Sequence, residues 1–163
     1  MEVLWSELSN GIPDGRHLAV LVIRLTAAVL CGAAIGFERQ RAGKAAGLRT
    51  HILVAAGTTV FILACLGAGM TTNSDGISRV IQGIITGIGF VGAGSILKRE
   101  TEKNISGVTT SAGIWMTAAI GVTVGLGALG LAILATILTL VILRVTIWFE
   151  RQARTQGPTA KVE

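Results

Sequence analysis

The chain has 163 residues, of which 51% are hydrophobic and 14% are charged. Soluble domains carry about 25% charged residues, so this composition excludes an ordinary water-soluble globular protein. The net charge is +5, but the basic residues stand between apolar runs, which is typical of topology signals and argues against nucleic acid as a partner. Cys31 and Cys65 lie inside apolar runs, and we expect unpaired, buried thiols.

The first 16 residues form a short polar N-terminal segment. It carries Glu2, Glu7 and Asp14 against a single Arg16. Because a secretory signal begins with a positively charged region, we expect no cleaved signal here.

Apolar blocks of about 20 residues follow, the length that crosses a hydrocarbon layer about 30 Å thick at about 1.5 Å per residue. They predict an all-α fold, a polytopic membrane bundle of about five helices within residues 17–148, before a short disordered tail at 149–163. The last boundary is open, because residues 121–132 are glycine-rich and uncharged: one long helix with a re-entrant piece is the alternative. The expected spans are 17–37, 50–69, 77–97, 108–126 and 127–148.

The distribution of basic residues predicts the orientation. Ten of the 14 basic residues fall in the segments 38–49 and 98–107 and in the tail. Positively charged loops stay on the cytoplasmic side, so we expect a multi-pass membrane protein with the N-terminus outside and the C-terminus inside.

Glycines four residues apart recur in three spans. Such stripes let helix backbones approach closely, either within the chain or in a homo-oligomer. The third span is the richest, and we expect it to be central, with bending or lining a path as the alternative. The expected helix-contact glycines are Gly32, Gly36, Gly83, Gly87, Gly89, Gly92, Gly94, Gly121 and Gly125.

Charged and amide side chains near the outer ends predict a polar cluster. Arg24 lies inside the first span, where an unpaired charge is costly; it either reaches the outer face along its long stem or pairs with Asp75. Asp75 and Arg79 are four residues apart, an arrangement that favours a surface pair and an N-cap, and Gln82 follows. We expect these four residues to hold or gate the bundle.

A basic segment follows the first span on the inner side. Its marked residues are Glu38, Arg39, Arg41, Arg49, Thr50 and His51. Thr50 is a fair N-cap. The segment is either a topology loop that contacts anionic lipid or a docking surface for a partner or lipid head group. His51 alone makes no metal site, and the sequence shows no catalytic pair, metal ligand set or cofactor motif.

Three blocks resemble the MgtC/SapB family of bacterial inner-membrane proteins: GFERQRAGKAAGLRTHILV at 36–54, DGISRVIQGIITGIGFVGAGSIL at 75–97 and GVTTSAGIWMTAAIG at 107–121. The resemblance covers roughly residues 20–145. The residues on the family's signature are Arg24, Glu38, Arg39, Gly47, Leu48, Arg49, Thr50, His51, Asp75, Arg79, Gln82, the glycines of 87–94, Thr109, Thr110 and Trp115.

The resemblance implies a role in adaptation to low magnesium and in survival within host cells, exerted on membrane partners that include F-type ATP synthase. Several members continue into a cytoplasmic ACT-like domain, whereas about 15 residues follow the last span here. A non-enzymatic regulator of membrane partners is therefore the first expectation. The alternative is a small ion transporter or channel, which Arg24 and the thin third span favour. A route for cations normally needs acidic residues at mid-depth of the membrane, and the sequence has none in the expected spans.

Overall fold

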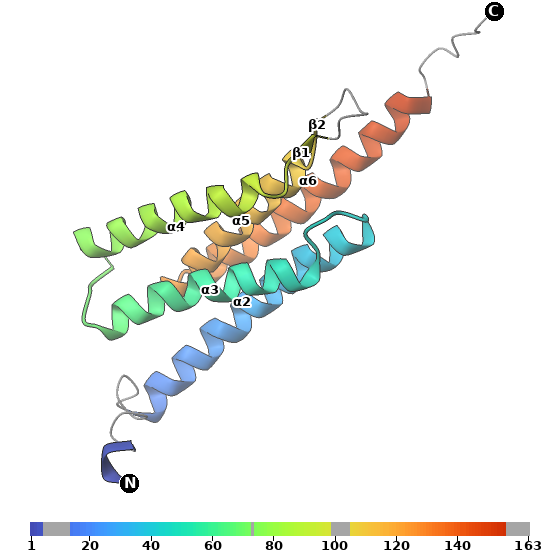
Figure 1. Cartoon of the computed structure of the whole chain (residues 1–163). Helices are drawn as coiled ribbons and strands as arrows, with labels where there is room; N and C mark the ends of the chain where they lie inside the picture. Colours follow the sequence, from blue (N-terminus) through green and yellow to red (C-terminus); the bar gives the residue numbers. More distant parts are fainter. Residues whose placement is uncertain (5–13, 73, 99–104, 156–163) are drawn as a thin grey trace, which may run out of the picture.

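The computed structural model describes residues 1–4, 14–72, 74–98 and 105–155, which form an almost entirely helical bundle (Figure 1). Two-residue strands, β1 (Leu97–Lys98) and β2 (Ile105–Ser106), pair antiparallel between the third and fourth long helices. The predicted all-α polytopic fold is confirmed. The long helices are α2 (Gly15–Arg41), α3 (Leu48–Gly67), α4 (Asp75–Ala93), α5 (Val108–Gly125) and α6 (Leu129–Thr155).

The helices match the expected spans in number and order. The first four, α2 to α5, are each long and apolar enough to cross a membrane, and α6 has a shorter apolar stretch, Leu129–Val145, among the described residues. Gly127 makes the turn between α5 and α6 with a φ of +88°, a backbone conformation that glycine adopts without a steric penalty. The alternative of one long helix with a re-entrant piece is therefore wrong.

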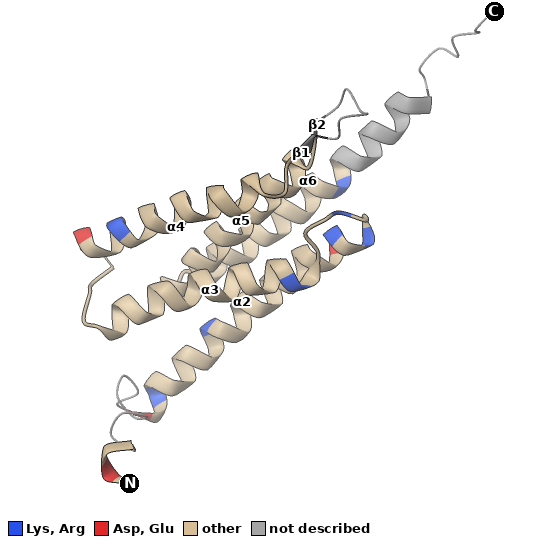
Figure 2. Cartoon of the chain, viewed as in Figure 1, with Lys and Arg blue, Asp and Glu red and all other residues tan. Residues whose placement is uncertain are grey.

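Because successive helices run in opposite directions, their ends gather at two ends of the bundle (Figure 1). The α2–α3 loop, the β1–β2 hairpin and the C-terminus of α6 lie at one end, which we call the hairpin end. The start of α2, the α3–α4 connection and the α5–α6 turn lie at the other, the turn end. Charged residues group toward the two ends, with largely uncharged helix between them (Figure 2).

Two helix boundaries at the hairpin end differ from the expected ones. Helix α2 continues to Arg41, so Glu38 and Arg39 belong to its last turns and not to a loop. Helix α3 begins at Leu48, and its N-cap is Gly47, so the expected N-cap role of Thr50 is wrong. The side-chain oxygen of Gln40 accepts a hydrogen bond from the Leu48 N–H at 3.3 Å and supplies the missing cap.

Two further boundaries also differ. Ser74 is the N-cap of α4, with its hydroxyl accepting from the Ile77 N–H, so Asp75 is the first helical residue and not the cap. Helix α6 extends to Thr155, so residues 149–155 of the expected disordered tail are helical. Residues 156–163 of that tail, and residues 99–104 of the second basic segment, lie outside the described residues.

Helix α3 packs closely against both α2 and α5, and the buried hydrophobic cluster is supplied mainly by α2, α5 and α6. A Cβ added to Gly32 or Gly36 of α2 would lie 2.6 Å from the His51 carbonyl oxygen or 2.7 Å from Leu48 Cα. A Cβ on Gly125 of α5 would lie 2.7 Å from Ile62 Cβ. Since these glycines leave no room for a side chain, both helices meet α3 backbone to backbone.

Helix α4 is peripheral, so the expected central position of the third span is wrong. A Cβ added to Gly83, Gly87 or Gly89 would have no atom within 4 Å, whereas one at Gly92 would meet Ser111 Oγ at 2.5 Å. Only 17% of the apolar window of α4 is buried, against 50% for α5. A glycine stripe predicts a flat helix face, but it does not predict whether anything covers that face.

Candidate functional site: a buried polar junction of α2, α3 and α5

Two charged side chains are buried at the hairpin end of α2. Arg39 is 1% exposed and Glu38 is 8% exposed. The guanidinium Nε and Nη2 donate to the two carboxylate oxygens of Glu38 at 2.5 and 2.8 Å. Among the described residues this is the one ion pair within 4 Å. The bidentate geometry is the strongest that a guanidinium and a carboxylate can make, so it compensates both charges for the loss of water.

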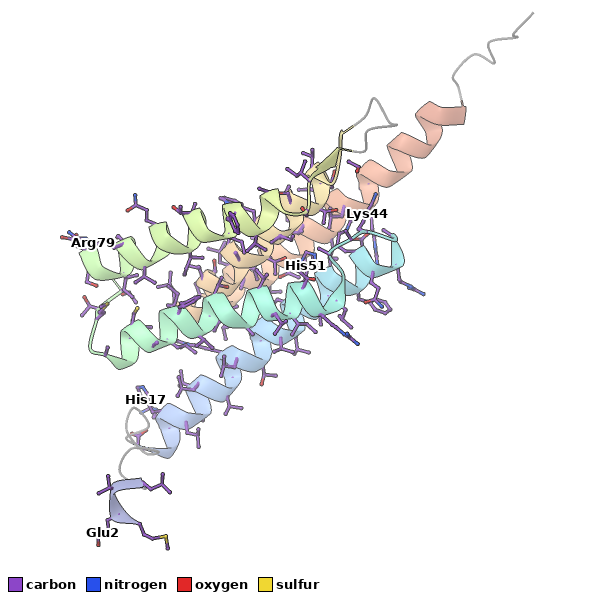
Figure 3. All side chains as sticks on the ribbon, in the orientation of Figure 1. Glu2, His17, Lys44, His51 and Arg79 are labelled. Carbon is purple, nitrogen blue, oxygen red and sulfur yellow. The ribbon has the colours of Figure 1, made fainter. Side chains whose placement is uncertain are left out.

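His51 lies in the first turn of α3 and is fully buried. Figure 3 places its side chain within the bundle, next to the loop that carries Lys44. His51 Nδ1 lies 2.7 Å from the hydroxyl oxygen of Thr117 on α5. That hydroxyl donates to the Gly113 carbonyl at 2.9 Å, so its lone pair accepts the proton of Nδ1. The contact joins α3 to α5 across the core.

The other ring nitrogen, Nε2, is buried and has no hydrogen-bond partner among the described residues. The charges of Arg39 and Glu38 are close enough to act on the ring electrostatically. We call Glu38, Arg39, His51 and Thr117 the polar junction. The His51–Thr117 contact joins the start of α3 to the middle of α5, and the Glu38–Arg39 pair lies in the last turns of α2, the helix whose Gly36 packs against His51.

A second hydrogen bond crosses the same interface farther along the helices. The hydroxyl of Thr59 on α3 donates to the Gly121 carbonyl of α5 at 2.8 Å. Its neighbour Thr58 bonds instead to the Val54 and Ala55 carbonyls of its own helix. Sequence reasoning missed Thr59 and Thr117. A threonine hydroxyl in an apolar run needs a hydrogen-bond acceptor. The sequence does not show whether that acceptor lies in the same helix or in a neighbouring one.

Replacing Thr117 by valine is expected to lower the free energy of unfolding by about 1–3 kcal/mol, because it leaves the buried Nδ1–H of His51 without an acceptor. Unfolding of the purified protein in detergent, followed by circular dichroism, measures the change. Thr123→Val is the matched control, since Thr123 bonds only to the Ala119 carbonyl of its own helix. Equal stability of the two variants would contradict a role for the His51–Thr117 bond.

The expected outer cluster of Arg24, Asp75, Arg79 and Gln82 is not assembled. Arg24 Nη1 donates instead to the Gly125 carbonyl at the end of α5, at 2.8 Å. The side chains of the other three are exposed on α4, and Figure 3 shows Arg79 at the turn end of that helix. The helix α5 leaves its last carbonyls without intrahelical donors, and this unpaired acceptor was the overlooked partner for Arg24.

The basic residues beyond the junction stay on the surface. Arg41, Lys44 and Arg49 are exposed at the hairpin end, and Thr50 is partly buried. The Arg41 guanidinium lies over the Phe37 ring, 5.0 Å from its centroid, in a cation–π contact. The polar residues of 38–51 therefore divide into two groups. Glu38, Arg39 and His51 are buried, whereas Arg41, Lys44 and Arg49 are exposed.

The fold and the junction together define a multi-pass helical membrane protein in which buried polar side chains join neighbouring helices. The sequence model of the MgtC family matches residues 25–152. The chain belongs to this family, which confirms the resemblance drawn from its three motifs.

Relatives of known name align with most of the chain. "Putative magnesium transporter YhiD" of Escherichia coli K12 is 46% identical over 133 residues, covering 78% of this chain and 60% of that protein. "Protein SrpB" of Synechococcus elongatus is 41% identical over 141 residues, covering 81% and 77%. "Protein MgtC" of Salmonella typhimurium LT2 is 46% identical over 119 residues, covering 73% and 49%. The chain thus spans less than two thirds of YhiD and about half of MgtC, and no solved structure matches it.

Proposed function

We propose that this protein is a non-enzymatic regulator of the bacterial inner membrane that acts by binding other membrane proteins along α4. In this proposal the N-terminus is outside and the hairpin end is cytoplasmic, because Arg41, Lys44 and Arg49 are exposed there. The single observation that carries the proposal is the glycine face of α4 at Gly83, Gly87 and Gly89, where an added Cβ would meet no other described residue within 4 Å.

The contrast between glycines within one chain supports this reading. Gly32, Gly36 and Gly125 contact a neighbouring helix so closely that no side chain would fit. Gly83 and Gly87 have the same spacing, but they line a groove of about 450 Å³ between α3 and α4. The remaining wall of this α3–α4 groove is apolar and includes Phe61 and Val91. A transmembrane helix with small residues along one side has the shape and chemistry to enter it.

The family resemblance makes F-type ATP synthase the first partner to test, in adaptation to low magnesium. Magnesium transport by the chain itself is the second candidate, since one relative is named a putative magnesium transporter. A cation path is normally lined by acidic side chains or carbonyls. The buried carboxylate among the described residues, Glu38, is already neutralised by Arg39, so the charge pattern favours regulation. Magnesium flux into vesicles containing only the purified protein would favour transport instead.

Leucine at Gly87 tests the regulator proposal. A Cβ there meets no atom within 4 Å, so Gly87→Leu is expected to fold normally while its side chain fills the groove. In membranes from cells that express the tagged protein, chemical cross-linking and mild-detergent purification should recover ATP synthase membrane subunits with the wild type. We expect at least a tenfold lower yield with Gly87→Leu.

Gly57→Leu is the matched control, because Gly57 on α3 also has open space at Cβ and does not line the groove. It should retain the partner. Equal recovery with all three proteins would contradict partner binding at α4. A cross-linked species of twice the chain mass, lost in Gly87→Leu, would assign the groove to a second copy of the chain.

A further inference from the structure

A second cleft lies at the turn end, between α2 and α3. It has a volume of about 590 Å³, within the range of ligand sites. The α2 and α3 ribbons diverge toward the start of α2, and Figure 3 shows His17 beside this opening. The wall is mainly apolar, with two basic side chains, His17 and Arg24. Its lining includes His17, Leu21, Arg24, Val60, Leu63 and Ala64.

Arg24 brings a positive charge to this cleft that no described carboxylate neutralises. One donor, Nη1, is used by the Gly125 carbonyl, out of the five N–H groups of a guanidinium. Arg39 and Glu38 form the one described ion pair, and they lie at the opposite end of the bundle. The Gly125 carbonyl accepts a hydrogen bond from the guanidinium but does not neutralise its positive charge. An anion in the cleft would therefore gain a charge-assisted hydrogen bond with Arg24.

The position of the guanidinium is fixed by the α5–α6 turn. A Cβ at Gly127 would lie 2.5 Å from Arg24 Nη2 and 3.0 Å from its Cζ. The turn therefore leaves room for the guanidinium only because residue 127 is glycine. Held between the Gly125 carbonyl and Gly127, Arg24 is preorganised and does not sweep through solvent.

The level of Arg24 in the bundle indicates which anion fits. Helix α5 has 18 residues, about 27 Å at 1.5 Å per residue, close to the hydrocarbon thickness. It ends at Gly125, the residue that Arg24 contacts, so Arg24 lies where a spanning helix reaches the head-group region. A small soluble anion would gain nothing from Leu25 and Val60, which lie on the bundle-centre side of Arg24, whereas the start of an acyl chain would bury its surface against them.

We propose that the α2–α3 cleft binds one anionic phospholipid. Its phosphate accepts hydrogen bonds from Arg24, with His17 at the mouth, and its acyl chains begin at Leu25 and Val60, at the deep end of the cleft, and continue into the hydrocarbon of the membrane. This site is separate from the α3–α4 groove and does not depend on the function proposed for it.

Native mass spectrometry of the full chain, delipidated in detergent and titrated with phosphatidylglycerol or phosphatidylcholine, tests the proposal. The wild type is expected to retain one phosphatidylglycerol in preference to phosphatidylcholine. Arg24→Gln should weaken this binding by about tenfold, since it removes a charge-assisted contact. Arg79→Gln is the matched control, because it removes the same charge at the same end from an exposed site on α4, and it should bind like the wild type.

A variant of the apolar wall keeps the test decisive if Arg24→Gln fails to fold. Ala64→Trp fills the cleft and leaves the Arg24–Gly125 bond in place, and it should also lose the bound lipid. Glycerol phosphate at millimolar concentration should not displace the lipid; displacement would assign the site to a free phosphate. Equal loss in Arg24→Gln and Arg79→Gln, or unchanged binding in Ala64→Trp, would overturn the proposal.

Discussion

Replacing Arg39 by methionine is expected to lower the free energy of unfolding by about 3–5 kcal/mol, the largest single effect we expect at the polar junction. The substitution keeps an unbranched side chain of similar length but removes the partner of Glu38. A buried carboxylate would then lack both of its donors, and breaking a buried ion pair in this way costs about that much. Unfolding in detergent, monitored by circular dichroism, gives the change.

Two further variants separate the charge effect from the loss of contacts. Glu38→Leu combined with Arg39→Met should recover most of the stability, because replacing a buried pair by apolar residues is often neutral. Arg41→Met removes an exposed charge from the same turn of α2 and should cost about 1 kcal/mol or less. An Arg39→Met protein as stable as Arg41→Met would contradict the account of the junction.

The fold was predictable from the sequence because spanning helices leave a strong signal. Apolar blocks of about 20 residues predicted the number and order of the helices, whereas the glycine-rich stretch 121–132 left the last boundary open, and the structure places a turn there at Gly127. The boundaries at charged residues were not predictable in the same way. Glu38 and Arg39 were interpreted as the exit from the membrane, but they continue the helix because each satisfies the other's charge.

The candidate site was predictable only in part, because its contacts depend on which helix faces which. His51 and Arg39 were singled out from the sequence, whereas Thr117 was not, since nothing in a threonine's neighbours shows which helix it will meet. Arg24 was expected to find an acid, but its partner is the Gly125 carbonyl. A backbone acceptor has no sequence signature except the helix end that exposes it.

The four-residue spacing of glycines occurs in two different structural environments in this chain. Gly121 and Gly125 have the same four-residue spacing as Gly83 and Gly87, yet the first pair contacts α3 and the second lines an unfilled groove. The spacing predicts that a helix backbone can be approached closely. Whether another helix of the same chain approaches that backbone depends on which helices are neighbours in the bundle. The sequence of one helix alone does not determine this.

The close contact of α2 with α3 predicts the second large loss of stability, on replacing Gly36. Alanine at this position would place its Cβ 2.7 Å from Leu48 Cα, 3.0 Å from His51 Cβ and 3.1 Å from the Gly47 carbonyl oxygen. Two of these atoms are backbone, so no side-chain rotation relieves the overlap, and α2 must move away from the start of α3. Such overpacking costs about 1–3 kcal/mol, and here it also displaces His51 from Thr117. We expect Gly36→Ala to unfold at a markedly lower temperature in detergent.

Gly83→Ala is the matched substitution, because the added methyl group meets no atom within 4 Å. The same change in the same residue type should leave the melting temperature of this variant within about 1 °C of the wild type, since surface substitutions away from such contacts change stability little. Combining Gly36→Ala with Thr117→Val should cost less than the sum of the single changes, because both act on the placement of His51. Additive losses would show that α2 and α5 contact α3 independently, and would contradict the polar junction as one unit.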